Sequence, residues 1–366
     1  MPGPGWYPDP WAPGAWRWWD GRVWTGHVQA AARAPRLPAW LSPPVLVGAV
    51  LVVPMLAVAL VAEPLATLLP LPSFLVLLAM FVWFDRLEPE PRAERIHAVL
   101  WGATITIAVA GFGNGLAAII GGPAFATVLV APVTEEVMKG LGILYAVRRR
   151  TIDSVTDGVV YAGWIGAGFA LVENVEYFVF ASAEGALVPV LIARGVLSPF
   201  AHPLFTVWIG IAVGRAVVRG RNPAAAALPG LALAILLHGL WNLATVVATG
   251  GGVGWALVLA AGFVGLFSGT AIVLVAGRLR GRDEFARAVP AVAARYGLTP
   301  EEVLVFSDWR RTLALRRSLP TRARPAFDAR HAAIARLVAW QRRPGPPDPV
   351  GEARLVASLW EARGRT

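Results

Sequence analysis

Ionisable and amide side chains lie in four otherwise apolar stretches of this sequence, and they are the groups with which the chain could do chemistry. The stretches are APVTEEVMKG, FALVENVEYF, SPFAHPLF and LLHGLWN. A charged group costs about 3 kcal/mol at the centre of a membrane helix and therefore marks a functional site by default. The candidate catalytic residues are Glu135, Glu136, Lys139, Glu173, Asn174, His202, His238 and Asn242.

The spacing of these residues allows them to meet. Glu135 and Lys139 are four apart, as are His238 and Asn242, and residues at this spacing share one face of an α-helix. Counting ~1.5 Å per residue places the glutamates and histidines roughly 18–24 Å from the cytoplasmic end of each stretch. Such groups can simply hold a helix bundle together by hydrogen bonds. Two histidines and at least three glutamates in one layer favour a chemical role.

Peptide hydrolysis is the reaction that these side chains suit, and the sequence leaves two versions of it open. In the first, His202 and His238 hold a divalent metal such as zinc, with a carboxylate from Glu173 or Glu136 as the third ligand. A remaining glutamate is then the general base. The HExxH helix of many zinc proteases is absent, so the ligands would come from separate helices.

The second version needs no metal. Glu135 or Glu136, together with one histidine, activates water directly, while His238 and Asn242 donate hydrogen bonds to the oxyanion. Lys139 is the only lysine in a chain that otherwise uses arginine. We predict that its compact ammonium offsets the burial of Glu135 and Glu136.

Other catalytic classes find no support in the sequence. Cysteine is absent, and there is neither a Gly-x-Ser-x-Gly element nor a pair of intramembrane aspartates. The strongest rival is a proton- or cation-coupled transporter, since buried Glu, His and Lys also mark ion pathways. Transporters are often built from internal repeats, and the pattern of apolar stretches shows none.

The elements that must position these groups are membrane-spanning helices. The chain is 56% hydrophobic and 15% charged, which is typical of an all-α polytopic membrane protein. Apolar runs of about 20 residues, enough to cross ~30 Å of hydrocarbon, predict about eight helices. They cover residues 45–63, 65–84, 97–120, 123–147, 157–181, 187–214, 224–248 and 253–277.

Arginines in the loops predict the orientation. They cluster at 86–95, 148–150, 215–221 and 278–282, which are the loops on one side, and Arg194 is the exception on the other. Positive loops face the cytoplasm, so both termini are predicted to be cytoplasmic. The composition predicts a bacterial plasma membrane, and the +10 charge points to an anionic lipid surface rather than to nucleic acid.

Four regions follow from these patterns. Residues 1–30 form a Trp-rich module, 31–44 a linker, 45–278 the transmembrane core and 283–366 a basic cytoplasmic helical tail. Thr299 followed by Pro300 predicts a helix start in the tail.

The motifs also resemble a known family. EExxK, FALVEN, a later lone histidine and HGLWN, preceded by DRLEPEPR at Asp85–Arg92, are similar in order and spacing to the PrsW family of bacterial intramembrane proteases, over roughly residues 45–275. That family is related to the type II CAAX prenyl endopeptidases, whose pattern matches Glu135, Glu136, His202, His238 and Asn242.

The resemblance implies an intramembrane endopeptidase that cleaves a single-span membrane protein, such as an anti-sigma factor, in a site-1-type reaction. Glu173-Asn174 departs from the prenyl-protease pattern, in which a histidine is expected, and this leaves the substrate class open. The stretch GWYPDP…RWWDGRVWTGH resembles a Trp-rich actinobacterial domain of unknown function.

Overall fold

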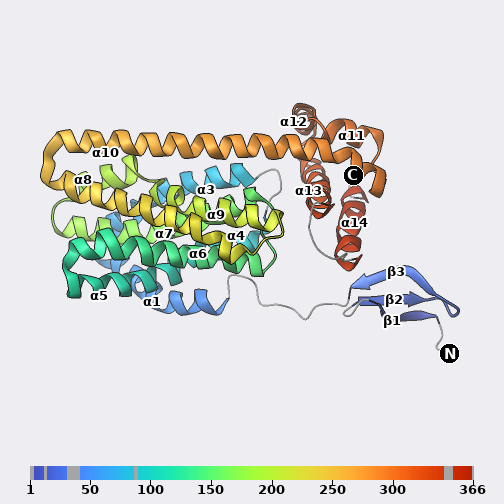
Figure 1. Ribbon diagram of the computed structural model, residues 1–366, viewed down its shortest axis with the longest axis horizontal. Helices are drawn as coiled ribbons and strands as arrows, with labels where there is room; N and C mark the ends of the chain where they lie inside the picture. The colour runs from blue at the N-terminus through green and yellow to red at the C-terminus, as the bar shows by residue number, and fades with distance from the viewer. Residues whose placement is uncertain (1–3, 12–14, 31–41, 86–89, 342–348, 365–366) are drawn as a thin grey trace. The chain divides into compact units, whose positions relative to one another are not determined.

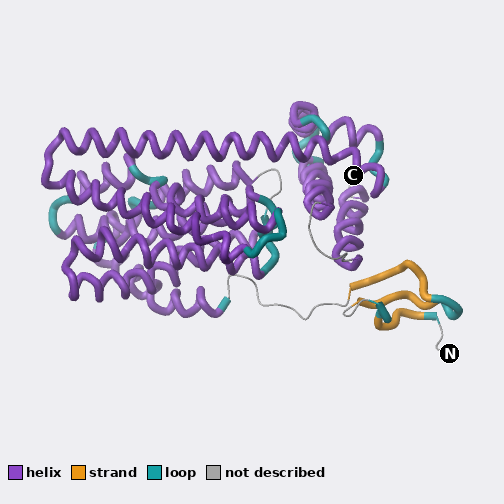
Figure 2. The backbone as a smooth tube through the Cα atoms, in the orientation of Figure 1, coloured by secondary structure: helices purple, strands orange, loops and turns teal. Residues whose placement is uncertain are grey.

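The computed structural model describes residues 4–11, 15–30, 42–85, 90–341 and 349–364 (Figure 1). Helices make up nearly all of this part of the chain, and its strands lie before residue 31 (Figure 2). One compact unit spans residues 37–278, and residues 1–36 and 279–366 are grouped in a second. The predicted all-α polytopic membrane fold is confirmed.

The membrane unit consists of α-helices interrupted by short π-helical segments, in which backbone hydrogen bonds join residues i and i+5. Its first half contains α1 (Pro43–Ala62), α2 (Pro64–Leu68), α3 (Leu71–Asp85), α4 (Arg92–Trp101), η2 (Gly102–Thr106), α5 (Ile107–Phe125), η3 (Ala126–Val130) and α6 (Ala131–Arg148). Its second half contains α7 (Val155–Ala183), α8 (Leu187–Val190), η4 (Leu191–Leu197), α9 (Ala201–Val218) and the start of α10 (Pro223–Tyr296).

Seven helical segments of the described residues are long and apolar enough to cross a membrane. Six correspond to single predicted helices, and the seventh covers the helices predicted at 97–120 and 123–147. Their outward faces carry exposed aliphatic side chains such as Val61 and Ile119, as expected for contact with lipid. The segments are Pro43–Ala62, Pro64–Asp85, Arg92–Arg148, Val155–Ala183, Leu187–Val218, Pro223–Val247 and Ala260–Tyr296.

The long segment Arg92–Arg148 reverses direction at Gly122. This glycine has φ +84°, a left-handed conformation that residues with a Cβ rarely adopt. Thr134 Oγ1 of α6 donates to Asn114 Oδ1 of α5 at 3.0 Å, whereas residues 20 apart in a straight helix would be separated by ~30 Å. The segment therefore supplies two antiparallel helices, α5 and α6, which lie side by side in Figure 1.

α10 also turns back on itself within the membrane unit. The rings of Trp241 and Phe263 lie 4.9 Å apart, although 22 residues separate them. The two arms correspond to the helices predicted at 224–248 and 253–277. The first arm brings His238 and Asn242 to the rest of the bundle.

The central helix α7 packs against α9 at very short range. A Cβ added to Gly158 would lie 2.2 Å from the Gly210 carbonyl oxygen, so only glycine at these positions lets the two backbones approach so closely. Most side chains of both helices are buried. The pair forms the best-packed part of the bundle and fixes the position of α9 relative to α7.

The second unit has two parts. Three antiparallel strands, β1 (Gly5–Pro8), β2 (Ala15–Trp19) and β3 (Trp24–Ala30), form a sheet in which Trp24 packs edge-on against Tyr7 and Trp19. The Trp-rich module predicted over residues 1–30 thus contains a small sheet, and residues 31–41 of the predicted linker lie outside the described residues.

The C-terminal helices share a core that includes Val289, Ile334 and Leu359. Thr299 caps its helix as predicted, by accepting a hydrogen bond from the Glu302 N–H. This part comprises the end of α10 and α11 (Pro300–Phe306), α12 (Trp309–Ser318), α13 (Arg324–Gln341) and α14 (Pro349–Gly364).

Candidate active site

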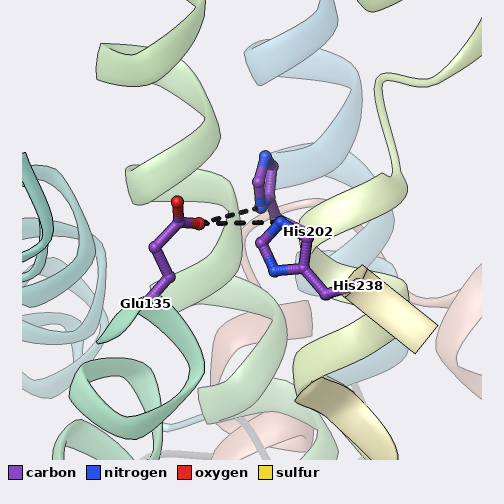
Figure 3. A group of neighbouring side chains, drawn as sticks. All are labelled: Glu135, His202 and His238. Carbon is purple, nitrogen blue, oxygen red and sulfur yellow. Dashed lines mark ion pairs between the residues drawn. The ribbon is translucent and has the colours of Figure 1, made fainter. Parts of the chain in front are cut away.

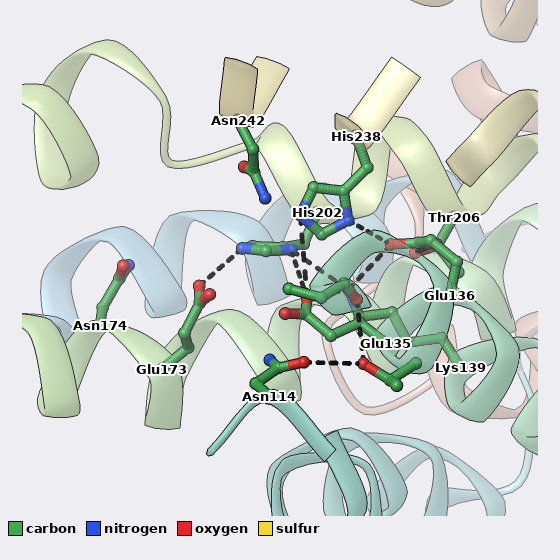
Figure 4. Close-up of polar contacts among 12 residues, drawn as sticks. Asn114, Glu135, Glu136, Lys139, Glu173, Asn174, His202, Thr206, His238 and Asn242 are labelled. Atoms are coloured by element: carbon green, nitrogen blue, oxygen red, sulfur yellow. Dashed lines mark hydrogen bonds and ion pairs between the residues drawn. The ribbon is translucent and has the colours of Figure 1, made fainter. Parts of the chain in front are cut away.

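Four helices bring the predicted polar residues together inside the membrane unit (Figure 4). Glu135, Glu136 and Lys139 come from α6, Glu173 and Asn174 from α7, His202 from α9, and His238 and Asn242 from α10. The side chains of Glu136 and Lys139 are completely buried. The polar side chains that the four helices carry therefore lie close together.

Glu135, His202 and His238 form the centre of this group (Figure 3). Glu135 Oε2 lies 3.8 Å from His202 Nδ1 and 3.8 Å from His238 Nε2. The ligand atoms of the three residues lie within 4.8 Å of one another, a spacing at which they could hold one metal ion. Two imidazole nitrogens and one carboxylate oxygen are a donor set that catalytic zinc sites use.

The neighbours of His202 determine which of its ring nitrogens carries hydrogen. Lys139 Nζ lies 3.1 Å from Nδ1, and an ammonium group can only donate, so Nδ1 accepts. Nε2 then carries the hydrogen and donates it to Glu173 Oε2 at 2.7 Å. Nδ1, whose lone pair accepts from Lys139, also lies 3.8 Å from Glu135 Oε2.

His238 has the matching arrangement with its nitrogens exchanged. Its Nδ1 lies 3.2 Å from Glu136 Oε1 and donates to it, and its Nε2 lies 3.8 Å from Glu135 Oε2. Glu136 also accepts hydrogen bonds from Lys139 Nζ at 2.9 Å and from Thr206 Oγ1 at 2.9 Å. Glu136 is held by three donors and orients a histidine.

Lys139 contacts both glutamates, as its position in the sequence suggested. Its Nζ donates to Glu135 Oε2 at 3.3 Å and to Glu136 Oε1, and it lies 3.9 Å from the centre of the Phe169 ring. The ammonium thus touches two of the three atoms that could hold a metal, Glu135 Oε2 and His202 Nδ1. These two atoms thus already surround a positive charge.

Glu173 was predicted to be a metal ligand, but it does not lie with the other two predicted ligands. It lies on the far side of the His202 ring, on Nε2, and also forms an ion pair with Arg194 of η4. Glu135 takes its place beside the two histidines. The depth count could not distinguish these positions, because it gives the level of a residue but not the direction of its side chain.

Asn174 and Asn242 lie at the edge of the site. Asn174 Oδ1 accepts a hydrogen bond from Arg194 Nε at 2.8 Å. Asn242 Nδ2 donates to the Thr127 carbonyl oxygen of η3 at 2.8 Å, and this amide has a second hydrogen. His238 was expected to donate to the oxyanion in the metal-free version, and its Nδ1 contacts Glu136.

A pocket of about 360 Å³ opens beside the group. Glu135, His202 and Asn242 line it, together with Asn114 and Arg194. Sequence reasoning missed Arg194 and Thr206 as parts of the site. Arg194 had a signal, since it was the one arginine on the side where the loops otherwise carry no arginine or lysine. Thr206, four residues after His202, shares its helix face.

The described part of DRLEPEPR lies apart from this pocket, at the cytoplasmic end predicted for the bundle. The Glu90 N–H donates to Asp85 Oδ2 at 3.0 Å, and Tyr161 Oη donates to Glu90 Oε2 at 2.9 Å. Burial and the nearby Asp157 carboxylate raise the pKa of Glu90 to about 10. Residues 86–89 of this motif lie outside the described residues.

Comparison with known proteins identifies the family to which this site belongs. Residues 90–275 match the family described as PrsW family intramembrane metalloprotease, and residues 4–37 match a protein of unknown function (DUF2510). The chain is 29% identical to Protease PrsW of Geobacillus kaustophilus over 169 residues, which are 45% of this chain and 73% of the relative.

It is 26% identical to Protease PrsW of Clostridioides difficile over 199 residues, which are 50% of this chain and 79% of the relative. No solved structure matches the chain. The family match covers half of the chain and includes the whole buried Glu/His group. The chain therefore belongs to the PrsW family of intramembrane metalloproteases and is an intramembrane endopeptidase that acts on membrane proteins.

Proposed function

We propose that Glu135, His202 and His238 hold one zinc ion with which the protein cleaves single-span membrane proteins inside the bilayer. One observation carries the proposal: each imidazole donates to a carboxylate through one nitrogen, and its other nitrogen lies 3.8 Å from Glu135 Oε2. Metal-binding histidines are commonly oriented by such a carboxylate.

The donor set fits a catalytic ion. Two histidines and one carboxylate fill three of the four positions that zinc prefers and leave the fourth for water. When bound, zinc polarises a carbonyl and lowers the pKa of that water. Glu136 and Glu173 lie on the outer ring nitrogens, so their role is to orient His238 and His202 rather than to bind the ion.

The other residues have separate tasks in hydrolysis. Glu135 lines the pocket, and the carboxylate oxygen that does not bind the ion would accept the proton of the attacking water as the carbon–oxygen bond forms. The second amide hydrogen of Asn242 can be donated to the oxygen of the scissile carbonyl as negative charge develops there. Lys139 supplies positive charge among three glutamates and limits their mutual repulsion.

The substrate and the orientation belong to the same proposal. The pocket lies within the membrane helices and is lined in part by alanines, which suits an apolar transmembrane segment. The arginines at the ends of α6 and α9 support a cytoplasmic location for both termini, in a bacterial plasma membrane. The structural division after Arg278 supports a core at 45–278 and a separate tail at 283–366.

The test is to measure zinc content and cleavage together in the same detergent-purified samples. The wild-type protein should contain one zinc per chain and cut a single-span reporter within its transmembrane segment. His202→Ala, His238→Ala and Glu135→Gln should each lose zinc and reduce cleavage at least ~100-fold.

The matched control is Arg149→Gln, which removes an ion pair with Glu94 away from the pocket. This variant should keep both zinc and cleavage. Full zinc occupancy in Glu135→Gln with cleavage abolished would make Glu135 a base only, and full activity after exhaustive chelation would refute the metal site.

A further inference from the structure

Arg194 is an arginine of the π-helical segment η4 that is held entirely by one turn of α7. It forms an ion pair with Glu173, and its Nε donates to Asn174 Oδ1 at 2.8 Å. Its guanidinium carbon lies 3.7 Å from the centre of the Tyr177 ring. An arginine within a candidate membrane span with three specific contacts calls for a functional explanation.

The contact with Glu173 connects Arg194 to the proposed metal group. Glu173 Oε2 pairs with Arg194 and also accepts from His202 Nε2 at 2.7 Å. His202 presents its other nitrogen, Nδ1, to Glu135. A continuous path of contacts thus runs from the arginine through one carboxylate and one imidazole to the atom that would bind the ion.

The second histidine has the same kind of support from a different cation. His238 Nδ1 donates to Glu136, and Glu136 is held by Lys139 and Thr206. Each imidazole is therefore oriented by a carboxylate that is itself fixed by a cationic side chain. The two halves of the group are equivalent in this respect, although the cations come from different elements.

We propose that Arg194 is a positioning residue for the metal site, which acts by holding Glu173 in the orientation that fixes the His202 ring. The inference rests on the proposed function, because it concerns the same three ligands. Glu173 lies at the wall of the pocket, and without the arginine its carboxylate can rotate away from His202. A histidine that loses its carboxylate partner binds metal about 10–100-fold more weakly.

Arginine suits this position better than lysine because its planar fork reaches two acceptors at once. One nitrogen of Arg194 contacts Glu173 while another contacts Asn174, which fixes the plane of the guanidinium. Lysine at this position could still pair with Glu173, but it would lack the second contact. Arg194→Lys should therefore recover most of the effect that a neutral replacement loses.

The experiment is a double-mutant cycle read out by zinc affinity of the metal-free protein, measured in detergent by competition with a chromogenic chelator. Arg194→Gln should weaken zinc binding about 10–100-fold, as should Glu173→Ala. The double variant should bind no more weakly than Glu173→Ala alone, because the arginine acts through that carboxylate. The zinc affinity of Arg194→Lys should lie within about threefold of the wild-type value. With RT at 0.59 kcal/mol, a threefold change corresponds to ~0.6 kcal/mol.

Arg149→Gln is the control, because it removes a comparable ion pair elsewhere on the bundle. The zinc affinity of this variant should equal that of wild type. Equal weakening by Arg194→Gln in the wild-type and Glu173→Ala backgrounds would overturn the inference, since Arg194 would then merely anchor η4. Absence of zinc binding by the wild-type protein would instead refute the proposed metal site itself. The two failures are thus distinguishable.

Discussion

Replacing Lys139 with methionine would test how much the buried ammonium stabilises the two neighbouring glutamates. The ammonium is completely buried and lies 2.9 Å from Glu136 Oε1 and 3.3 Å from Glu135 Oε2. Methionine has a similar length and fills the space beside Phe169, so the main change is the loss of charge. Removing one partner of a buried ion pair leaves its partner uncompensated and typically costs about 3–5 kcal/mol.

The same structure predicts that zinc reverses this loss. Lys139 touches Glu135 Oε2 and His202 Nδ1, so the ammonium competes with the ion for two of its three ligands. At roughly 2–4 °C per kcal/mol for a domain of this size, the metal-free Lys139→Met protein should melt roughly 6–20 °C below wild type. Added zinc should raise the melting temperature of the variant more than that of wild type, because the bound ion supplies the missing positive charge.

The assay is thermal unfolding in one detergent, with chelator and with zinc, for wild type and Lys139→Met. Arg149→Gln is the control, since it removes an ion pair with Glu94 away from the proposed ligands. Its zinc-induced shift should equal that of wild type. A zinc-induced shift in Lys139→Met no larger than in wild type would refute the competition between ammonium and ion.

Three further predictions concern separate parts of the chain. Asn242→Ala should lower the cleavage rate about 100-fold or more if the amide stabilises the oxyanion, while zinc content stays at wild-type level. An unchanged rate would show that Asn242 serves only to bind the Thr127 carbonyl. Glu90→Gln should flatten the dependence of stability on pH. Because the pKa of Glu90 is about 10 in the folded protein against an ordinary value of 4.5 for a glutamate in water, the folded state keeps a proton that the unfolded state releases, and stability falls as pH rises through this window. The slope is at most about 1.4 kcal/mol per pH unit. Melting curves at pH values from about 6 to about 9 should show it in wild type and less of it in the variant, and equal slopes would contradict it. A reporter fused after Thr366 or inserted near Ser154 should be protected from reagents outside intact cells, and labelling of either site from outside would overturn the predicted topology.

Much of the site could be predicted because helix geometry is regular. Glu135 and Lys139 lie four residues apart on one helix face, and the structure brings their charged groups within 3.3 Å. Counting the depth of His202 and His238 placed both at the level of Glu135, where they are found. Periodicity and rise per residue were sufficient for these contacts because each polar group lies within one continuous helix.

The direction of the Glu173 side chain and the part played by Arg194 could not be obtained in this way. Glu173 sits at the right depth but faces the outer nitrogen of His202, and this depends on the rotation of α7 set by its contact with α9. Arg194 lies in a π-helical segment, where i to i+5 bonding changes the face on which a residue lies. Such segments have no simple sequence signature.

The close approach of α7 and α9 has a mechanical consequence. Glu173 and His202 belong to two helices whose backbones touch at Gly158 and Gly210, so we expect these residues to move together. His238 belongs to the first arm of α10, most of whose surface lies outside the protein core. A displacement of α10 that widened the pocket would carry one imidazole away from the other.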